Sequence, residues 1–473
     1  MSTFGGLNTA LSGLVAARTG LDVVGQNIAN ATTEGYTRQR ISTSAAGATA
    51  QTGMVDQGAR VGQGVSVDGI ARLGSAQLDL TVRTAAAASG YSAIRANSLA
   101  AMESSLKEPG DNGLSAQLSA FWAGWQDLSN NADAVSPAAL LLERAGELTA
   151  QIRQGHQAID SEWSSVRGSL TAMVSELNTA ATEVADLNVQ IRTIVASGGS
   201  ANELLDRRSA LTTTIAALSG ATVREQHDGT VTVLVGGSAL VAGGTAGALS
   251  ASGASRLSGL SDATAVSLSW AGSGQTVSLQ SGEIAGAVSL LAPVTPGGSG
   301  GAIAEAAAGY DAFAADLAGK VNAIYGAGTG AVFFSGTTAS TLSVAVTSAT
   351  GVIAGDPAKG TYDGSIADAI AQLGAGAATD AAGAAIDSPS TAWSNFVTTL
   401  GVQTQSALQN AKLDGLTSTA AVGQQLANSS VDMDEENVNM LMYQTAYQAA
   451  ARVMTAVDEM LDILINRTGL VGR

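Results

Sequence analysis

The sequence predicts a mainly α-helical protein with an inserted β-rich domain. Three observations support this fold class. All six prolines of the 473-residue chain lie between Pro109 and Pro389, so both ends can form uninterrupted helices. Near both ends and through the middle, apolar residues recur at spacings that alternate between three and four, the pattern of supercoiling helices. Alternation at every second residue, typical of a β domain, becomes prominent after about residue 220.

The composition narrows the classes of partner. Hydrophobic residues make up 45 % of the chain but aromatics only 4 %, which favours closely packed helices. The formal net charge of −17 disfavours nucleic acid and anionic membranes as partners. The absence of cysteine excludes disulfides and thiolate metal sites. We find neither a bilayer-spanning apolar run nor the features of a cleaved secretory signal, so we expect a cytoplasmic protein or one exported without such a signal.

The first element expected is a terminal helix followed by an extended connector, over residues 1–60. Its apolar positions follow the three-four alternation: Leu7, Ala10, Leu14, Ala17, Leu21, Val24 and Ile28. The small polar residues 30–33 and Gly35 then predict the end of the helix. Extended pieces are expected over 36–41 and around Val65, Val67 and Ile70.

Residues 61–220 are expected to contain a long antiparallel helical hairpin, the N-terminal part of a helical domain. The alternation continues from Leu142 to Ile194 without a slip, which corresponds to a rod of roughly 80 Å. A turn is predicted at Ser197–Ser200, and Leu204 to Leu218 form the return helix.

Residues 221–375 are expected to form a small outer β-rich domain. Val231, Val233 and Val235 alternate after the turn dipeptide Asp228–Gly229. An alanine-rich helix through residues 313–324 and further short strands near 342–346 complete this region.

The chain is expected to be helical again from Pro389 to its end. Residues 376–430 would complete the helical domain, and 431–473 would form a C-terminal helix that pairs with the N-terminal one as a coiled coil. This last helix repeats the three-four spacing: Met440, Tyr443, Tyr447, Ala450, Met454, Val457, Leu461 and Leu464.

No catalytic, cofactor-binding or metal-ligating set is predicted. The segment 297–301 matches a G-x-S-x-G pattern but has the composition of a linker, and both histidines, His156 and His227, precede it. The acidic cluster 432–436 lacks the glycine of a calcium loop and is expected to complement the dipole of the helix that follows.

Two segments carry a resemblance to a known family. NIANATTEGYTR (27–38) and SSVDMDEENVNMLMYQTAYQAAARVMTAVDEMLDILIN (429–466) resemble the end signatures of the bacterial flagellar axial proteins of rod, hook and hook–filament junction. NELLDRRSAL (202–211) and the long hairpin are most similar to the junction members. The matching motif residues are Asn27, Asn30, Thr33, Gly35, Tyr36 and Arg38.

The resemblance implies a structural subunit, not an enzyme, that polymerises at the distal end of the hook. It implies a homo-oligomeric ring, contacts with hook protein and with a second hook-associated junction protein, and an export chaperone of the FlgN type bound through the C-terminal helix. The protein would be made in the cytoplasm and secreted to the flagellum without a cleaved signal. Alternatives are a hook or distal-rod subunit, or a secreted hydrolase on helical stalks.

The terminal helices are expected to fold together on assembly, because a lone amphipathic helix cannot bury its apolar stripe. The assembly seam would consist of Leu7, Leu14, Leu21, Val24, Ile28, Tyr443, Tyr447, Met454, Val457, Leu461 and Leu464.

Overall fold

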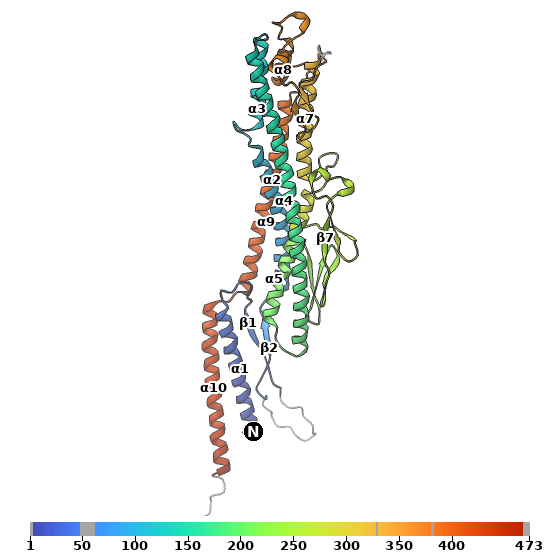
Figure 1. Ribbon diagram of the computed structural model, residues 1–473. Helices are drawn as coiled ribbons and strands as arrows, with labels where there is room; N and C mark the ends of the chain where they lie inside the picture. Colours follow the sequence, from blue (N-terminus) through green and yellow to red (C-terminus); the bar gives the residue numbers. More distant parts are fainter. Residues whose placement is uncertain (1–2, 48–61, 328–329, 380–382, 467–473) are drawn as a thin grey trace, which may run out of the picture.

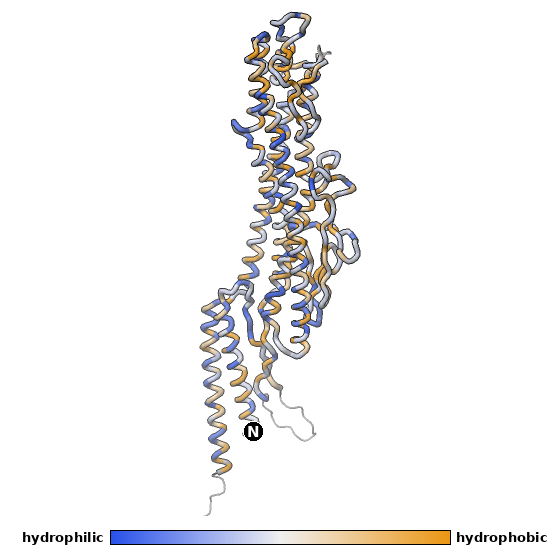
Figure 2. Tube along the Cα trace, in the orientation of Figure 1, coloured by the Kyte–Doolittle hydropathy of each residue, from blue (hydrophilic) through white to orange (hydrophobic). Residues whose placement is uncertain are grey.

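The computed structural model describes residues 3–47, 62–327, 330–379 and 383–466. The molecule is elongated, with a pair of terminal helices at one end and a long helical body above them (Figure 1). Strands lie along one side of that body. Apolar segments occur along the whole length of the rod, including the terminal pair (Figure 2).

The terminal pair consists of α1 (Thr3–Ala29) and α10 (Met433–Asn466), which pack against each other. After α1 the chain forms an antiparallel ribbon of β1 (Gln39–Ala45) and β2 (Val65–Arg72), with a register shift between Ser42 and Thr43. The expected terminal helix and the two extended pieces are therefore present.

The helical body is built around one very long helix. Its members are α2 (Ala76–Leu106), α3 (Leu114–Asn130), α4 (Val135–Ala196), α5 (Asn202–Ser219) and α9 (Pro389–Ser429). The 62 residues of α4 span about 93 Å. The turn after α4 and the return helix α5 are as predicted, but α5 is short, and α2 and α9 pack along each other to complete the bundle.

Residues 221–375 contain strands and three helices. The sheets are β3-β4-β5-β6, β7-β8-β9 and β10-β11, all antiparallel. Their bounds are β3 Thr222–Glu225, β4 Val231–Val235, β5 Ser238–Ala242, β6 Thr245–Ala246, β7 Leu249–Ser252, β8 Ser267–Trp270, β9 Thr276–Val277, β10 Phe334–Ser335 and β11 Ser343–Val344. The helices are α6 Glu283–Leu290, α7 Ala302–Gly326 and α8 Ser365–Gly374, with single 3₁₀ turns at 257–259, 262–264, 349–351 and 357–359.

The predicted β3–β4 hairpin is present. Gly229 has a φ of +81°, which glycine adopts without strain, and the side chain of Asp228 accepts the backbone N–H of Thr230 at 3.0 Å. Val231, Val233 and Val235 are buried, as their alternation predicts. The apolar residues of the sheets and of α7 join those of α3 and α4 in one core, so the strands pack against the helical body. The domain boundaries remain a prediction.

The chain is helical from Pro389 to Asn466, as predicted, except for a short break at residues 430–432, and residues 467–473 lie outside the described part of the structure. The helix ends at Ser429, Ser430 has extended backbone, and α10 begins at Met433. The carboxylate of Asp432 accepts the backbone N–H groups of Asp434 and Glu435 at 2.8 and 3.3 Å, which caps the new helix. Polar residues that favour caps thus interrupt the helix between the body and the terminal pair.

Candidate functional site at the junction of the terminal pair and the helical body

The two terminal helices are antiparallel, and three glycines of α1 face α10. Facing pairs recur every seven residues: Gly6 with Val457, Gly13 with Ala450, and Gly20 with Tyr443. A methyl group at Gly20 would lie only 2.6 Å from Cε1 of the Tyr443 ring. A side chain larger than hydrogen would therefore require the Tyr443 ring or the two helices to shift at this point.

The predicted seam residues are buried to different extents in the single chain. Val24 and Val457 are buried, whereas Leu7, Leu14, Leu21, Ile28, Tyr443, Met454 and Leu461 are half-buried. Tyr447 is 38 % exposed, and the side chain of Leu464 lies outside the described part of the structure. The buried positions of α1 are Ala10, Ala17, Gly20, Val23, Val24 and Asn27. The leucines therefore lie at the edge of the contact.

α10 carries many large apolar side chains that no described residue covers. Exposed fractions reach 66 % at Val438, 60 % at Leu441 and 72 % at Ile465. Met442, Val453, Met460 and Ile463 are also about half exposed. An apolar helix face of this length is unusual on the surface of a soluble monomer and marks an interaction surface.

Asn27 is the centre of the polar junction at the end of the pair. Its side chain is 1 % exposed and makes four hydrogen bonds, which is its full capacity. It donates to the backbone oxygen of Gln39 at 2.9 Å and to Oε2 of Glu436 at 3.2 Å. It accepts from the hydroxyl of Tyr36 at 2.9 Å and from the backbone N–H of Gln39 at 3.0 Å. One residue thus ties α1, the connector and α10 together.

Arg38 neutralises the acidic start of α10. Its guanidinium forms ion pairs with Glu435 and, at 2.8 Å, with Glu436, whose side chain is only 2 % exposed. Burial alone would lower the pKa of Arg38, but hydrogen bonds and charges of the two glutamates outweigh it and raise the pKa. The backbone of Arg38 also donates to Ser429 at the end of α9, at 2.9 Å. The acidic cluster therefore does more than complement a helix dipole.

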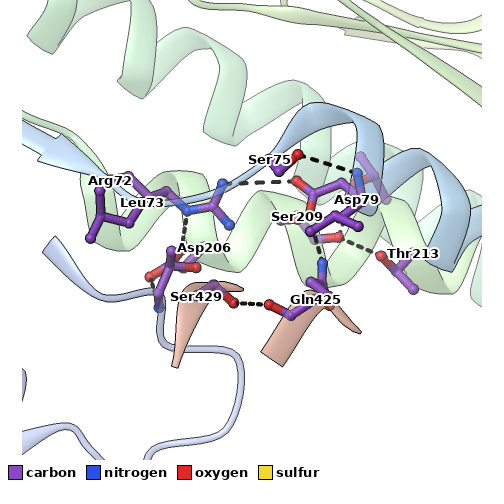
Figure 3. Close-up of polar contacts among 12 residues, drawn as sticks. Arg72, Leu73, Ser75, Asp79, Asp206, Ser209, Thr213, Gln425 and Ser429 are labelled. Atoms are coloured by element: carbon purple, nitrogen blue, oxygen red, sulfur yellow. Dashed lines mark hydrogen bonds and ion pairs between the residues drawn. The ribbon is translucent and has the colours of Figure 1, made fainter. Parts of the chain in front are cut away.

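A second network joins the connector to the body (Figure 3). Arg72, at the end of β2, contacts both Asp206 of α5 and Asp79 of α2. Asp206 also accepts the backbone N–H of Thr37 at 3.0 Å. From α9, the side-chain amide of Gln425 donates to Asp79 at 2.6 Å. Every element that meets at the junction is thus bonded to another through a charged side chain.

Tyr36 lies between the two networks. Burial, together with the negative charges of Glu203, Asp206 and Glu436, raises the pKa of Tyr36 to about 12. Its neutral hydroxyl, which donates to Asn27, is therefore the stable form at all physiological pH values.

The remaining motif residues shape the turn after α1. The side chain of Asn30 donates to the backbone oxygen of Gln26 at 3.0 Å and accepts from the hydroxyl of Thr33 at 3.2 Å. Gly35 has a φ of +76°, a left-handed conformation that disfavours other residues. The motif predicted from sequence thus divides into turn residues, Asn30 to Gly35, and junction residues, Asn27, Tyr36 and Arg38.

Sequence reasoning missed the glycines, the contacts of Glu436 with Asn27 and Arg38, and the pair of Arg72 with Asp206. The seven-residue spacing of Gly6, Gly13 and Gly20 was a usable signal for a close helix contact. The ion pairs had no such signal, because Arg72 and Asp206 are 134 residues apart.

The other candidate positions take no part in the junction. His156 is partly buried, with Nε2 3.9 Å from Asp311, and His227 is exposed. The segment 297–301 links α6 to α7. Within the described ranges, no group of three or more histidine, aspartate or glutamate side chains could hold a metal ion. Among these same residues, no helix combines the length and hydropathy of a membrane span.

Three sequence families match the chain. Residues 99–340, more than half of it, match the flagellar hook-associated protein FlgK helical domain. Residues 7–37 match the flagella basal body rod protein family, and 423–467 match the C-terminal region of the flagellar basal body rod FlgEFG proteins. The two rod-family matches cover most of the terminal helices and the motif residues up to Thr37.

Individual relatives of the chain carry names that agree with these family matches. Flagellar hook-associated protein 1 of Bacillus subtilis is 28 % identical over the full length of both chains. The protein of that name in Salmonella typhimurium is 31 % identical over 52 % of this chain and 44 % of its own length. The structure of the flagellar hook junction protein FlgK from Burkholderia pseudomallei has a similar fold, with a TM-score of 0.58 and 16 % identity over 74 % of this chain and all of that one.

The class defined by this fold and these terminal segments is that of structural proteins of the bacterial flagellum. Within that class the chain belongs to the FlgK family, flagellar hook-associated protein 1, the hook–filament junction protein. It is a structural subunit with a role in flagellum assembly and motility.

Proposed function

We propose that this chain polymerises as a ring at the distal end of the hook and joins the hook to the filament. Hook protein would lie on one side of the ring and a second hook-associated protein on the other. One observation carries this proposal: the terminal pair leaves the apolar face of α10 open, with Val438, Leu441 and Met442 more than half exposed. Terminal helices of neighbouring subunits have the chemistry to cover it.

Assembly would complete the burial of the seam. Leu7, Leu14 and Leu21 are half-buried in the single chain, and a neighbouring helix would cover their exposed edges. The heptad spacing supports the further proposal that the pair supercoils as a coiled coil. Because the hydrophobic gain is realised only on contact, ordering of the terminal helices would be coupled to polymerisation.

Before assembly the same face needs protection. An export chaperone of the FlgN type, bound to the apolar side of α10, would keep the subunit monomeric in the cytoplasm. Secretion to the growing flagellum would then proceed without a cleaved signal peptide.

The first experiment is electron microscopy of a strain that lacks the gene, combined with an assay of filament protein in the medium. Hooks without filaments, and filament subunits shed into the medium, are expected. Missing hooks would place the chain among the rod or hook subunits, and intact filaments would refute a junction role.

A second experiment tests the seam with single charges. Glutamate in place of Leu14, Leu21, Val457 or Leu461 should block incorporation, because the charge would be desolvated between helices. Leu140→Glu is the matched control: Leu140 is 45 % exposed on α4, far from the terminal pair. Complementation, flagellar fractionation and circular dichroism of the purified variants provide the readouts. Normal incorporation of the seam variants would contradict the proposed seam.

A further inference from the structure

A polar cleft of about 330 Å³ lies between α2, α5 and the β3–β4 hairpin, on the body side of the junction. Its lining includes the side chains of Arg72, Arg83 and Arg208 and the carboxylates of Asp79 and Glu225. Since one water molecule occupies about 30 Å³ of liquid, the cleft has room for a small ion and part of its hydration shell.

The three arginines differ in their partners. Arg72 is paired with Asp206 and lies 4.0 Å from Asp79. Among the described residues, no carboxylate oxygen lies within ion-pair distance of Arg83 or Arg208. Arg83 and Arg208 therefore lack a direct ion pair among the described residues, and the charge of Glu225 acts on them only from a greater distance.

Arg83 uses little of its hydrogen-bonding capacity. Its Nε is buried and has no hydrogen-bond partner among the described protein atoms. Its Nη1 reaches only the hydroxyl of Thr212, at a long 3.5 Å. A guanidinium has five N–H donors, and buried donors are normally satisfied.

Arg208 is 6 % exposed, and its bonds are to neutral acceptors. Nη1 donates to Oδ1 of Asn188 at 3.0 Å and to the backbone oxygen of Gly229 at 2.7 Å. Burial lowers the pKa of Arg208 to about 10, Glu225 opposes this shift, and the charge of Arg72 adds to it. Burial likewise lowers the pKa of Arg83. Both cations are thus held where their charge is poorly compensated.

We propose that this cleft binds a small tetrahedral oxyanion of the phosphate or sulfate class, held by Arg83 and Arg208. Such an ion matches the fork geometry of guanidinium groups and supplies the missing negative charge. It would join α2, α5 and the β3–β4 hairpin beside the Arg72 network. This inference is independent of the proposed place of the chain in the flagellum.

The test uses the full-length protein in chloride buffer at pH 7 and constant ionic strength, titrated with millimolar inorganic phosphate. The readouts are the Tm and direct binding by calorimetry. Variants are Arg83→Gln and Arg208→Gln. The control is Arg207→Gln on the same helix, whose side chain is 67 % exposed and contacts Glu183. Sulfate and acetate titrations distinguish a tetrahedral oxyanion from carboxylates.

We expect a saturable rise in Tm for the wild type and for Arg207→Gln. The Arg83→Gln variant should bind phosphate about tenfold to a hundredfold more weakly, since a hydrogen bond to a charged group is lost. Without phosphate, Arg83→Gln should be at least as stable as the wild type, because an uncompensated buried charge is removed.

Equal responses of wild type and Arg83→Gln would identify a general salt effect and overturn the proposal. So would the absence of saturable binding to the wild type by calorimetry. If Arg208→Gln fails to fold, the comparison of Arg83→Gln with Arg207→Gln decides the question. If Arg83→Gln also fails to fold, calorimetry on the wild type and Arg207→Gln decides.

Discussion

Alanine at Gly20 tests whether the two terminal helices approach as closely as the structure indicates. In a helix interior, alanine is more stable than glycine by about 0.5–1 kcal/mol. At Gly20, however, the added methyl group would lie 2.6–2.7 Å from three ring atoms of Tyr443. Overpacking of this kind costs about 1–3 kcal/mol. We therefore expect Gly20→Ala to leave the pair unchanged or to destabilise it by up to about 2 kcal/mol.

Gly25 provides a matched control on the same helix. It is exposed, and a methyl group there would meet no atom within 4 Å. Gly25→Ala should therefore stabilise α1 by the full helix-propensity difference. The two variants should differ by about 1–3 kcal/mol, which corresponds to a difference of roughly fivefold to more than a hundredfold in an equilibrium constant.

Hydrogen exchange of peptides from 433–466 measures the opening of the pair in the purified chain. Gly20→Ala should accelerate exchange in α10 relative to Gly25→Ala. In a Tyr443→Ala background the penalty at Gly20 should disappear, because the clashing ring is absent. Equal protection in the two glycine variants would refute the close approach. Absence of protection in all variants would show that the pair does not form in the free chain.

Further predictions concern the polar junction. Arg38→Met should destabilise the junction by about 3–5 kcal/mol in urea unfolding, because the buried Glu436 loses its counter-charge. Glu435→Gln should cost less than about 1 kcal/mol in the same assay, because the side chain of Glu435 is 62 % exposed. Asn27→Asp keeps the acceptor for Tyr36 but places a carboxylate beside Glu436. The variant should therefore lose about 1–3 kcal/mol of unfolding free energy at pH 7 and recover part of it at pH 4. Urea unfolding at both pH values measures this. Tyr36 has a pKa of about 12 in the folded protein against its ordinary 10.0, so its contribution to stability is complete below pH 10 and is lost as the pH rises to 12. The Tyr36→Phe variant should lack this alkaline loss of stability in a series of Tm measurements. At pH 7 the substitution should cost about 1 kcal/mol.

The sequence was most informative where structure depends on short-range patterns. The heptad spacing predicted both terminal helices and α4, and the Asp228–Gly229 turn with its alternating valines predicted the β3–β4 hairpin. The helices α2 and α3 were not identified as separate elements. Their burial depends in part on α9 and α8, respectively, which are more than 230 residues away in the chain.

The candidate site was predictable only in part. A three-four repeat predicts which residues share a helix face but not which side of that face meets the partner helix. The leucines of α1 were therefore predicted as contact residues, whereas the glycines face α10. Asn27, Tyr36 and Arg38 were identified through the motif. The contacts of Asn27 and Arg38 with Glu436 join residues about 400 positions apart, and no spacing in the sequence encodes such a distance.

The facing pairs that recur every seven residues define the register of α1 against α10. In each facing pair the two residue numbers add up to 463, and the polar pair of Asn27 and Glu436 obeys the same rule as the three glycine pairs. Sliding α10 by one heptad would place the carboxylate of Glu436 against Gly20 or beyond the end of α1, and the amide of Asn27 would lose its acceptor. Apolar contacts alone would tolerate such a slide, since one heptad resembles the next. The polar pair of Asn27 and Glu436 therefore selects one register of the two terminal helices.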